Sequence, residues 1–135
     1  ADRGVRGLEW LEVAPVMTQE TRRRQSRGRD SASGAAVEGY EIHIGDTSGP
    51  DRDRAWLRLG DRTEGAASAD GRVQGCYLHG LFTSDAFRAA YFARIGAPLD
   101  PLDYQQGVDD TLDALATHLE THLNVEQLLA LATEV

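Results

Sequence analysis

The sequence has no lysine, a single cysteine and no long apolar run. All 14 basic residues are arginines, and 22 acidic residues give a formal net charge of −8. This charge argues against a general nucleic-acid binder and against docking on an anionic membrane. Without a run of about 18 apolar residues, we expect no membrane span. One cysteine cannot form an internal disulfide, and the first residues lack a basic-then-apolar signal, so we expect a cytoplasmic location.

Length and composition are those of one globular domain. The chain has 135 residues, of which 41% are hydrophobic and 27% charged. These values are close to the average for soluble globular proteins, and the length is too short for two separate cores.

The first half of the chain is expected to form strands. Residues 8–17 form an apolar segment that favours a strand, interrupted or ended by Pro15. The Arg-rich stretch 18–36 is interpreted as a loop or a flexible strand edge. Residues 37–44 alternate as a second strand, with one face made of Tyr40, Ile42 and Ile44 and the other of Glu41 and His43.

Further short strands and then helices follow. We expect a short strand at 55–59, a hairpin turn at Asp70-Gly71 and a strand at 72–79. A helix capped by Thr83 or Ser84 then runs to Ile95, with later helices at 107–123 and 125–132. Strands first and two or three helices last are typical of the back half of a larger α/β domain, because such helices cover one face of a sheet only.

His79 is the residue that most favours a functional role. It ends the predicted strand 72–79, and ligands of open α/β sheets bind at the carboxyl ends of strands. Gly80 lets the backbone turn sharply at this point. The alternative is a histidine packed at a strand end and hydrogen-bonded to backbone.

Three segments carry a resemblance to a known family. GYEIHIG at 39–45, DGRVQGCYLHGLF at 70–82 and FRAAYFARIG at 87–96 resemble the C-terminal part of the cobyric acid synthases, a family of CobB/CobQ-type glutamine amidotransferases. The resemblance runs from about Gly7 to about Ala132. The related cobyrinic acid a,c-diamide synthases share the general pattern, but GYEIHIG together with YLHGLF favours the first family.

The resemblance implies a fold and an activity. It implies the C-terminal half of a class I, flavodoxin-like glutamine amidotransferase domain over residues 1–135, with the nucleophile half and an ATP-dependent synthetase domain outside them. In this family a Cys attacks the amide of glutamine, and the ammonia released amidates carboxylates of the corrin ring, from adenosylcobyrinic a,c-diamide to adenosylcobyric acid, in cobalamin biosynthesis. ATP and magnesium are expected for the complete enzyme, none within this chain, and the corrin is expected to contact the missing domain.

The resemblance also implies site residues. The His of YLHGLF is the proton-transfer partner of the Cys, and this role falls on His79. Further candidates for lining the site are Glu41, His43, Tyr77 and Gly80. Many class I amidotransferases orient the His with a Glu two residues later, where this chain has Leu81. Glu41 is a candidate orienting group, and its alternative is a salt-bridged strand residue.

Other reactive residues give weaker patterns. Cys76 has opposite strand parity to His79 and lacks the sharp turn that a nucleophile of this kind occupies, so we interpret it as a buried structural thiol. His118 and His122 do not match a zinc-protease helix and are expected on a solvated face. Surface ion pairing is the expected role of Asp51 and Asp53 with their neighbouring arginines, and no metal site is predicted. The run Arg22–Arg29 lacks interleaved aromatics, so a solvated loop or a charged domain contact is expected.

Three functional hypotheses remain open, one of them an amidotransferase part of another ligase of the superfamily, such as a cobyrinic acid a,c-diamide synthase. As a fragment of a glutamine-hydrolysing amidoligase, the isolated chain is expected to be inactive, and to fold poorly because its parallel sheet is incomplete. The alternative is a truncated, non-catalytic binding module that keeps the amidotransferase fold.

Overall fold

A computed structural model describes residues 4–99 and 103–132. It divides into two compact units, Ala1–Leu99 and Asp100–Val135. The elements of the first unit are β1 Ala14–Asp30, β2 Ala36–Ser48, η1 Pro50–Asp53, β3 Leu57–Leu59, β4 Arg62–Glu64, β5 Ala66–Ala67, β6 Gln74–Gly75, β7 Leu78–His79, η2 Leu81–Thr83 and α1 Asp85–Arg94. The second unit contains α2 Tyr104–His122 and α3 Val125–Leu131.

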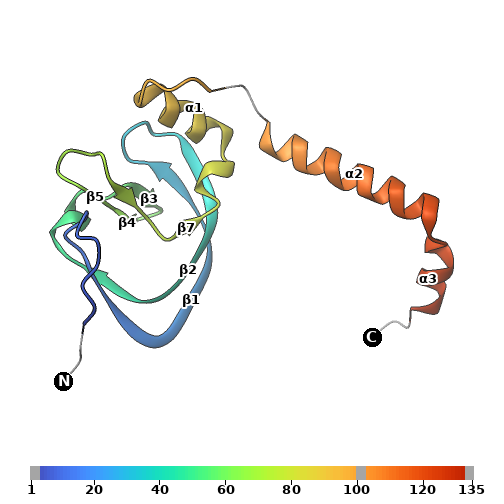
Figure 1. Cartoon of the computed structure of the whole chain (residues 1–135), viewed down its shortest axis with the longest axis horizontal. Coiled ribbons are helices and arrows are strands. Elements are labelled where there is room, and N and C mark those ends of the chain that lie inside the picture. Colours follow the sequence, from blue (N-terminus) through green and yellow to red (C-terminus); the bar gives the residue numbers. More distant parts are fainter. Residues whose placement is uncertain (1–3, 100–102, 133–135) are drawn as a thin grey trace. The chain divides into compact units, whose positions relative to one another are not determined.

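The sheet is antiparallel wherever its strands pair. Five strands follow the order β4-β3-β1-β2-β7, and β5 and β6 form a separate two-stranded sheet. Every pair within the described residues is antiparallel. The expectation of a parallel sheet is therefore wrong for this part of the chain, although the mixture of strands and helices is confirmed. Figure 1 shows β1 and β2 as two long strands that bend together, which curls the sheet.

β1 differs most from the structure that the sequence predicts. The expected strand at 8–17 begins only at Ala14, and the stretch expected to be a loop or a flexible strand edge continues to Asp30 as a strand that lies between β3 and β2. The strand forms because twelve of its residues pair with β2, with a register shift between Val16 and Thr21. Arginines are tolerated in this strand because their long aliphatic stems can lie along it while the guanidinium groups stay in water.

β2 confirms the predicted alternation, and its Tyr40 face is the exposed one. Tyr40, Ile42 and Ile44 share one face as expected, yet Tyr40 is 57% exposed and the two isoleucines are also exposed. Glu41, on the opposite face, is only 4% exposed. The apolar row therefore lies on the outer face of the curled sheet, and the inner face holds a buried carboxylate.

The core of the first unit lies between the inner face of the sheet, η2 and α1. It is made of Val37, Trp56, Leu57, Leu59, Leu78, Leu81 and Phe87. The predicted cap of α1 is confirmed at Ser84, whose Oγ accepts from the backbone N–H of Phe87 and donates to the carbonyl of Ala36. This second bond ties the start of α1 to the start of β2, so α1 and the site strand β7 are anchored on the same strand.

The strand expected at 72–79 is interrupted. The predicted Asp70-Gly71 turn is confirmed, since Ser68 and Val73 pair across it and Gly71 has a φ of 70°. Beyond it, β6 and β7 belong to different sheets, and residues 76–77 lie between them outside both ladders. The parity argument that separated Cys76 from His79 therefore does not hold, because the two residues do not share one strand.

The second unit is a pair of helices, of which α2 begins at Tyr104, three residues before the expected start at 107. Asp103 caps α2 and Asn124 caps α3 through their side-chain oxygens. Taken alone, this unit buries no residue of α2. Among the described residues, the helices are too short or too polar to cross a membrane.

Candidate functional site

His79 lies where β7 meets β2. Its backbone pairs with Tyr40, and the approach is so close that a Cβ at Gly39 would overlap the carbonyl oxygen of His79. The chain then turns at Gly80, whose φ of 84° belongs to the left-handed region that favours glycine. The predicted strand end and the predicted sharp turn are both confirmed.

Two backbone carbonyls hold the imidazole of His79. Its Nδ1 lies 2.9 Å from the oxygen of Tyr77 and 3.2 Å from that of Tyr40. Because a carbonyl oxygen only accepts hydrogen bonds, Nδ1 carries the proton in this arrangement. In the neutral ring Nε2 then keeps its lone pair, and the side chain is exposed. The arrangement can accept a proton at Nε2 while the ring is fixed through Nδ1.

Glu41 is engaged elsewhere. Its carboxylate accepts hydrogen bonds from Ser26 Oγ and Arg62 Nη2 on the inner side of the sheet. Burial, the largest single influence, raises the pKa of Glu41. The hydrogen bonds of Ser26 and Arg62, together with the charges of Arg62 and Arg24, outweigh it, so the pKa lies below its ordinary value. Glu41 is thus a salt-bridged strand residue, which was the alternative to an orienting role. The groups that contact His79 Nδ1 are backbone carbonyls instead.

Tyr77 is held at several points. Its ring stacks on His43, with centroids 4.4 Å apart and planes 19° from parallel. Its hydroxyl lies 2.6 Å from Thr47 Oγ1, and its backbone N–H donates to Glu64 Oε1 at 2.9 Å. Of the predicted lining residues, His43 and Tyr77 therefore contact each other, while the carbonyl of Tyr77 contacts His79. The buried Nδ1 of His43 has no hydrogen-bond partner among the described residues.

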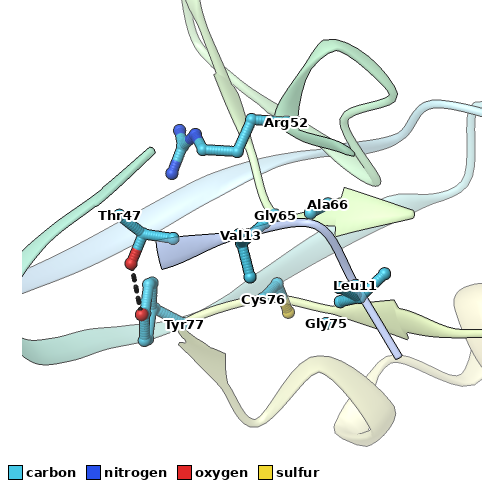
Figure 2. Close-up of a pocket in the computed structure, with 9 residues that line it drawn as sticks. All are labelled: Leu11, Val13, Thr47, Arg52, Gly65, Ala66, Gly75, Cys76 and Tyr77. Carbon is cyan, nitrogen blue, oxygen red and sulfur yellow. Dashed lines mark hydrogen bonds between the residues drawn. The ribbon is translucent and has the colours of Figure 1, made fainter. Parts of the chain in front are cut away.

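A cavity of about 220 Å³ lies beside Tyr77. Figure 2 shows its lining, which is made of Leu11, Val13, Thr47, Arg52, Gly65, Ala66, Gly75, Cys76 and Tyr77. His79 is not part of this lining, so the candidate catalytic histidine and this cavity are separate features.

Cys76 lies in the wall of that cavity as a half-buried thiol. Burial is the main cause that raises the pKa of Cys76, and its Sγ lies 3.9 Å from the carbonyl of Leu78. Since the thiolate is the nucleophile, a raised pKa lowers the share of thiolate and so the reactivity of this sulfur. The chemistry of the thiol therefore supports the structural role that strand parity had suggested.

The remaining candidates do not form a site in the described residues. His118 and His122 lie on one side of α2 with ring centroids 4.2 Å apart, and both are exposed within their unit. The described part of the chain contains no group of three or more His, Cys, Asp or Glu that could hold a metal ion. Asp51 ion-pairs with Arg54 as expected, but it is buried and also accepts from the N–H of Glu12.

The Arg22–Arg29 run is part of β1 rather than a loop. Arg27 pairs with Glu38 across the strands, and Arg29 donates to the carbonyl of Gly34. The side chain of Arg22 lies outside the described residues. The expected solvation of the other arginines is confirmed, since all are exposed.

Three residues in the surroundings of His79 were not predicted from the sequence. Glu64 and Arg62 come from β4 and Thr47 from the end of β2, and each bonds a residue that lies 13 to 30 positions away. Only the pairing of distant strands brings these groups together, so no local pattern could have revealed them. The one available signal is Glu64 itself, a carboxylate directly before a glycine turn.

Comparisons with known proteins give a consistent result. A model of the CobB/CobQ-like glutamine amidotransferase domain matches residues 1–87. A cobyric acid synthase of Ruegeria sp. is 54% identical over 131 residues, which cover 97% of this chain and 27% of the relative. Cobyric acid synthases of Rhodobacter capsulatus and Bradyrhizobium diazoefficiens are 53% and 48% identical over 126 residues. The chain spans about a quarter of the length of these relatives, 26–27%. No solved structure matches it.

Proposed function

The chain belongs to the CobB/CobQ-like glutamine amidotransferase family, and on that premise we propose that it supplies the histidine half of a glutaminase site in a cobyric acid synthase. The activity would be the ATP-driven, glutamine-dependent amidation of adenosylcobyrinic a,c-diamide to adenosylcobyric acid. The relatives' shared name supports this reaction over that of the a,c-diamide synthases. ATP, magnesium and the corrin are proposed to act outside this chain, in a cytoplasmic enzyme.

The observation that carries the proposal is the fixed imidazole of His79. Its Nδ1–H points at two carbonyls, and its Nε2 is left to exchange a proton. A thiol of a cysteine outside this chain gives its proton to Nε2, and the thiolate sulfur attacks the amide carbon of glutamine. The C–N bond then breaks as Nε2–H protonates the leaving nitrogen, which departs as ammonia. Water, losing a proton to Nε2, hydrolyses the thioester, and glutamate and the thiol are released.

The nucleophile is proposed to lie outside these residues because Cys76 is a poor candidate. Burial raises its pKa, and Cys76 lines a cavity of which His79 is not part. We further propose that the flavodoxin-like parallel strands of the domain also lie outside the described residues, since every described strand pair is antiparallel.

The test compares two nitrogen sources in the gene product that carries this chain. His79→Ala should abolish amidation with glutamine and leave amidation with ammonium chloride near the parent rate, because only ammonia release needs the imidazole. The 135-residue chain alone should not hydrolyse glutamine. Glutamine-dependent activity that survives His79→Ala would refute the role of His79. Equal loss with both nitrogen sources would favour a structural role and the non-catalytic module.

A further inference from the structure

Tyr77 provides the shorter of the two hydrogen bonds to His79, yet no strand ladder holds it. It lies between the last residue of β6, Gly75, and the first residue of β7, Leu78. A residue inside a ladder has its peptide groups fixed by neighbouring strands. Tyr77 lies outside both ladders, and a side chain rather than a neighbouring strand accepts its N–H.

Glu64 is the side chain that fixes the main chain of Tyr77. Its Oε1 accepts the N–H of Tyr77 at 2.9 Å, and only 4% of Glu64 is exposed. An N–H that loses its buried acceptor costs free energy, so the main chain is strongly held in this geometry. Glu64 therefore fixes the residue whose carbonyl orients the imidazole.

The position of Glu64 is itself determined by its surroundings. The next residue, Gly65, has a φ of 79°, and a Cβ there would lie 2.6 Å from the carbonyl oxygen of Gly75. The turn after β4 is thus packed directly on β6, close to Tyr77. Arg62 lies 3.9 Å from Glu64 Oε2 and also ion-pairs with Glu41, the residue that follows Tyr40 in β2. One guanidinium therefore links both regions whose carbonyls contact His79.

We propose that Glu64 is a positioning residue for His79 and acts through the main chain of Tyr77. It would do from a distant strand what a glutamate two residues after the histidine does in many class I amidotransferases, a position that Leu81 occupies here. The inference rests on the proposed role of His79. It concerns a hydrogen-bond acceptor, so a neutral acceptor of the same shape should serve in place of the carboxylate.

The experiment compares Glu64→Ala with Glu64→Gln in the gene product that carries this chain. Glu64→Ala removes the acceptor, so we expect the kcat of glutamine hydrolysis to fall about tenfold or more, with ammonia-dependent amidation retained. Glu64→Gln keeps an oxygen near the N–H of Tyr77 and should retain most of the kcat. Glu38→Ala is the matched control, because it removes another strand glutamate with an arginine partner, Arg27, at an exposed position.

A second readout does not depend on the reaction. The ¹⁵N shifts of His79 in the gene product that carries this chain should show Nδ1–H in the parent and in Glu64→Gln, and a mixture of tautomers in Glu64→Ala. If Glu64→Ala does not fold, Thr47→Val removes the partner of the Tyr77 hydroxyl and should shift the tautomers in the same direction. An unchanged tautomer and kcat in Glu64→Ala, or equal damage by Ala and Gln, would overturn the proposal. Activity that survives His79→Ala would instead overturn the proposed function.

Discussion

Gly39→Ala tests whether the close approach of β2 and β7 sets the position of His79. A Cβ at this residue would lie 3.1 Å from the carbonyl carbon of His79 and 3.3 Å from Leu78 Cγ, and it would overlap the carbonyl oxygen of His79. The obstructing atoms are mainly backbone, which cannot rotate away as a side chain can. The two strands must therefore separate, and β7 is only two residues long.

The expected cost of Gly39→Ala follows from this overlap. Overpacking of this kind costs about 1–3 kcal/mol, and the fixed backbone places it toward the upper end. For a domain of this size, each kcal/mol lowers Tm by roughly 4–8 °C. A displacement of about 1 Å at a catalytic group costs up to about 10²-fold in rate, so glutaminase activity should fall by more than Tm alone explains.

Thermal unfolding followed by circular dichroism measures the first effect, and glutamine hydrolysis by the complete gene product measures the second. Gly75→Ala is the matched control for stability, because a Cβ there would meet only Leu11 Cδ1, at an ordinary 3.7 Å. Its free energy of unfolding should change by no more than about 0.5 kcal/mol. A Gly39→Ala protein with the Tm and the turnover of the parent would refute the reasoning.

Three further predictions concern the core, the buried carboxylate and the thiol. Phe87, 1% exposed, fills the core, so Phe87→Ala should lower the free energy of unfolding in urea by about 3–5 kcal/mol, and a loss below about 1 kcal/mol would contradict this packing. The pKa of Glu41 is lowered in the fold because the hydrogen bonds of Ser26 and Arg62, together with the charges of Arg62 and Arg24, outweigh burial. Its carboxylate therefore adds stability above the unfolded pKa of about 4.3, and this stability is lost as pH falls through the folded pKa. Glu41→Gln should thus reduce the fall of the free energy of unfolding at acid pH. An unchanged fall would count against the hydrogen bonds of Ser26 and Arg62 to this carboxylate. Burial raises the pKa of Cys76, so iodoacetamide at pH 7.5 should alkylate it more slowly than free cysteine by mass spectrometry, and equal rates would contradict its assignment as a structural thiol.

The local features of the fold could be predicted from the sequence, and the long-range ones could not. The alternation of β2 and the cap at Ser84 were predictable because neighbouring residues determine them. The Arg-rich part of β1 was not, because its strand conformation comes from pairing with β2 rather than from its own composition. The exposed Tyr40 row shows that alternation alone does not tell which face is buried.

The candidate site was predictable in the same uneven way. His79 and Gly80 lie at the strand end and turn where the motif places them. The break between β6 and β7 was missed because its one local signal, Gly75, is also compatible with a continuous strand. Glu64 was missed because its partner Tyr77 is 13 residues away and comes near only when the turn at Gly65 packs on β6.

The most direct test is the tautomer of His79 in the unaltered gene product that carries this chain. Two-dimensional ¹H–¹⁵N spectra tuned to histidine rings distinguish a neutral imidazole protonated at Nδ1 from one protonated at Nε2. The account predicts Nδ1–H with an unprotonated Nε2, because the carbonyls of Tyr77 and Tyr40 both accept from Nδ1. A ring protonated at Nε2, or an equal mixture of the two tautomers, would contradict it.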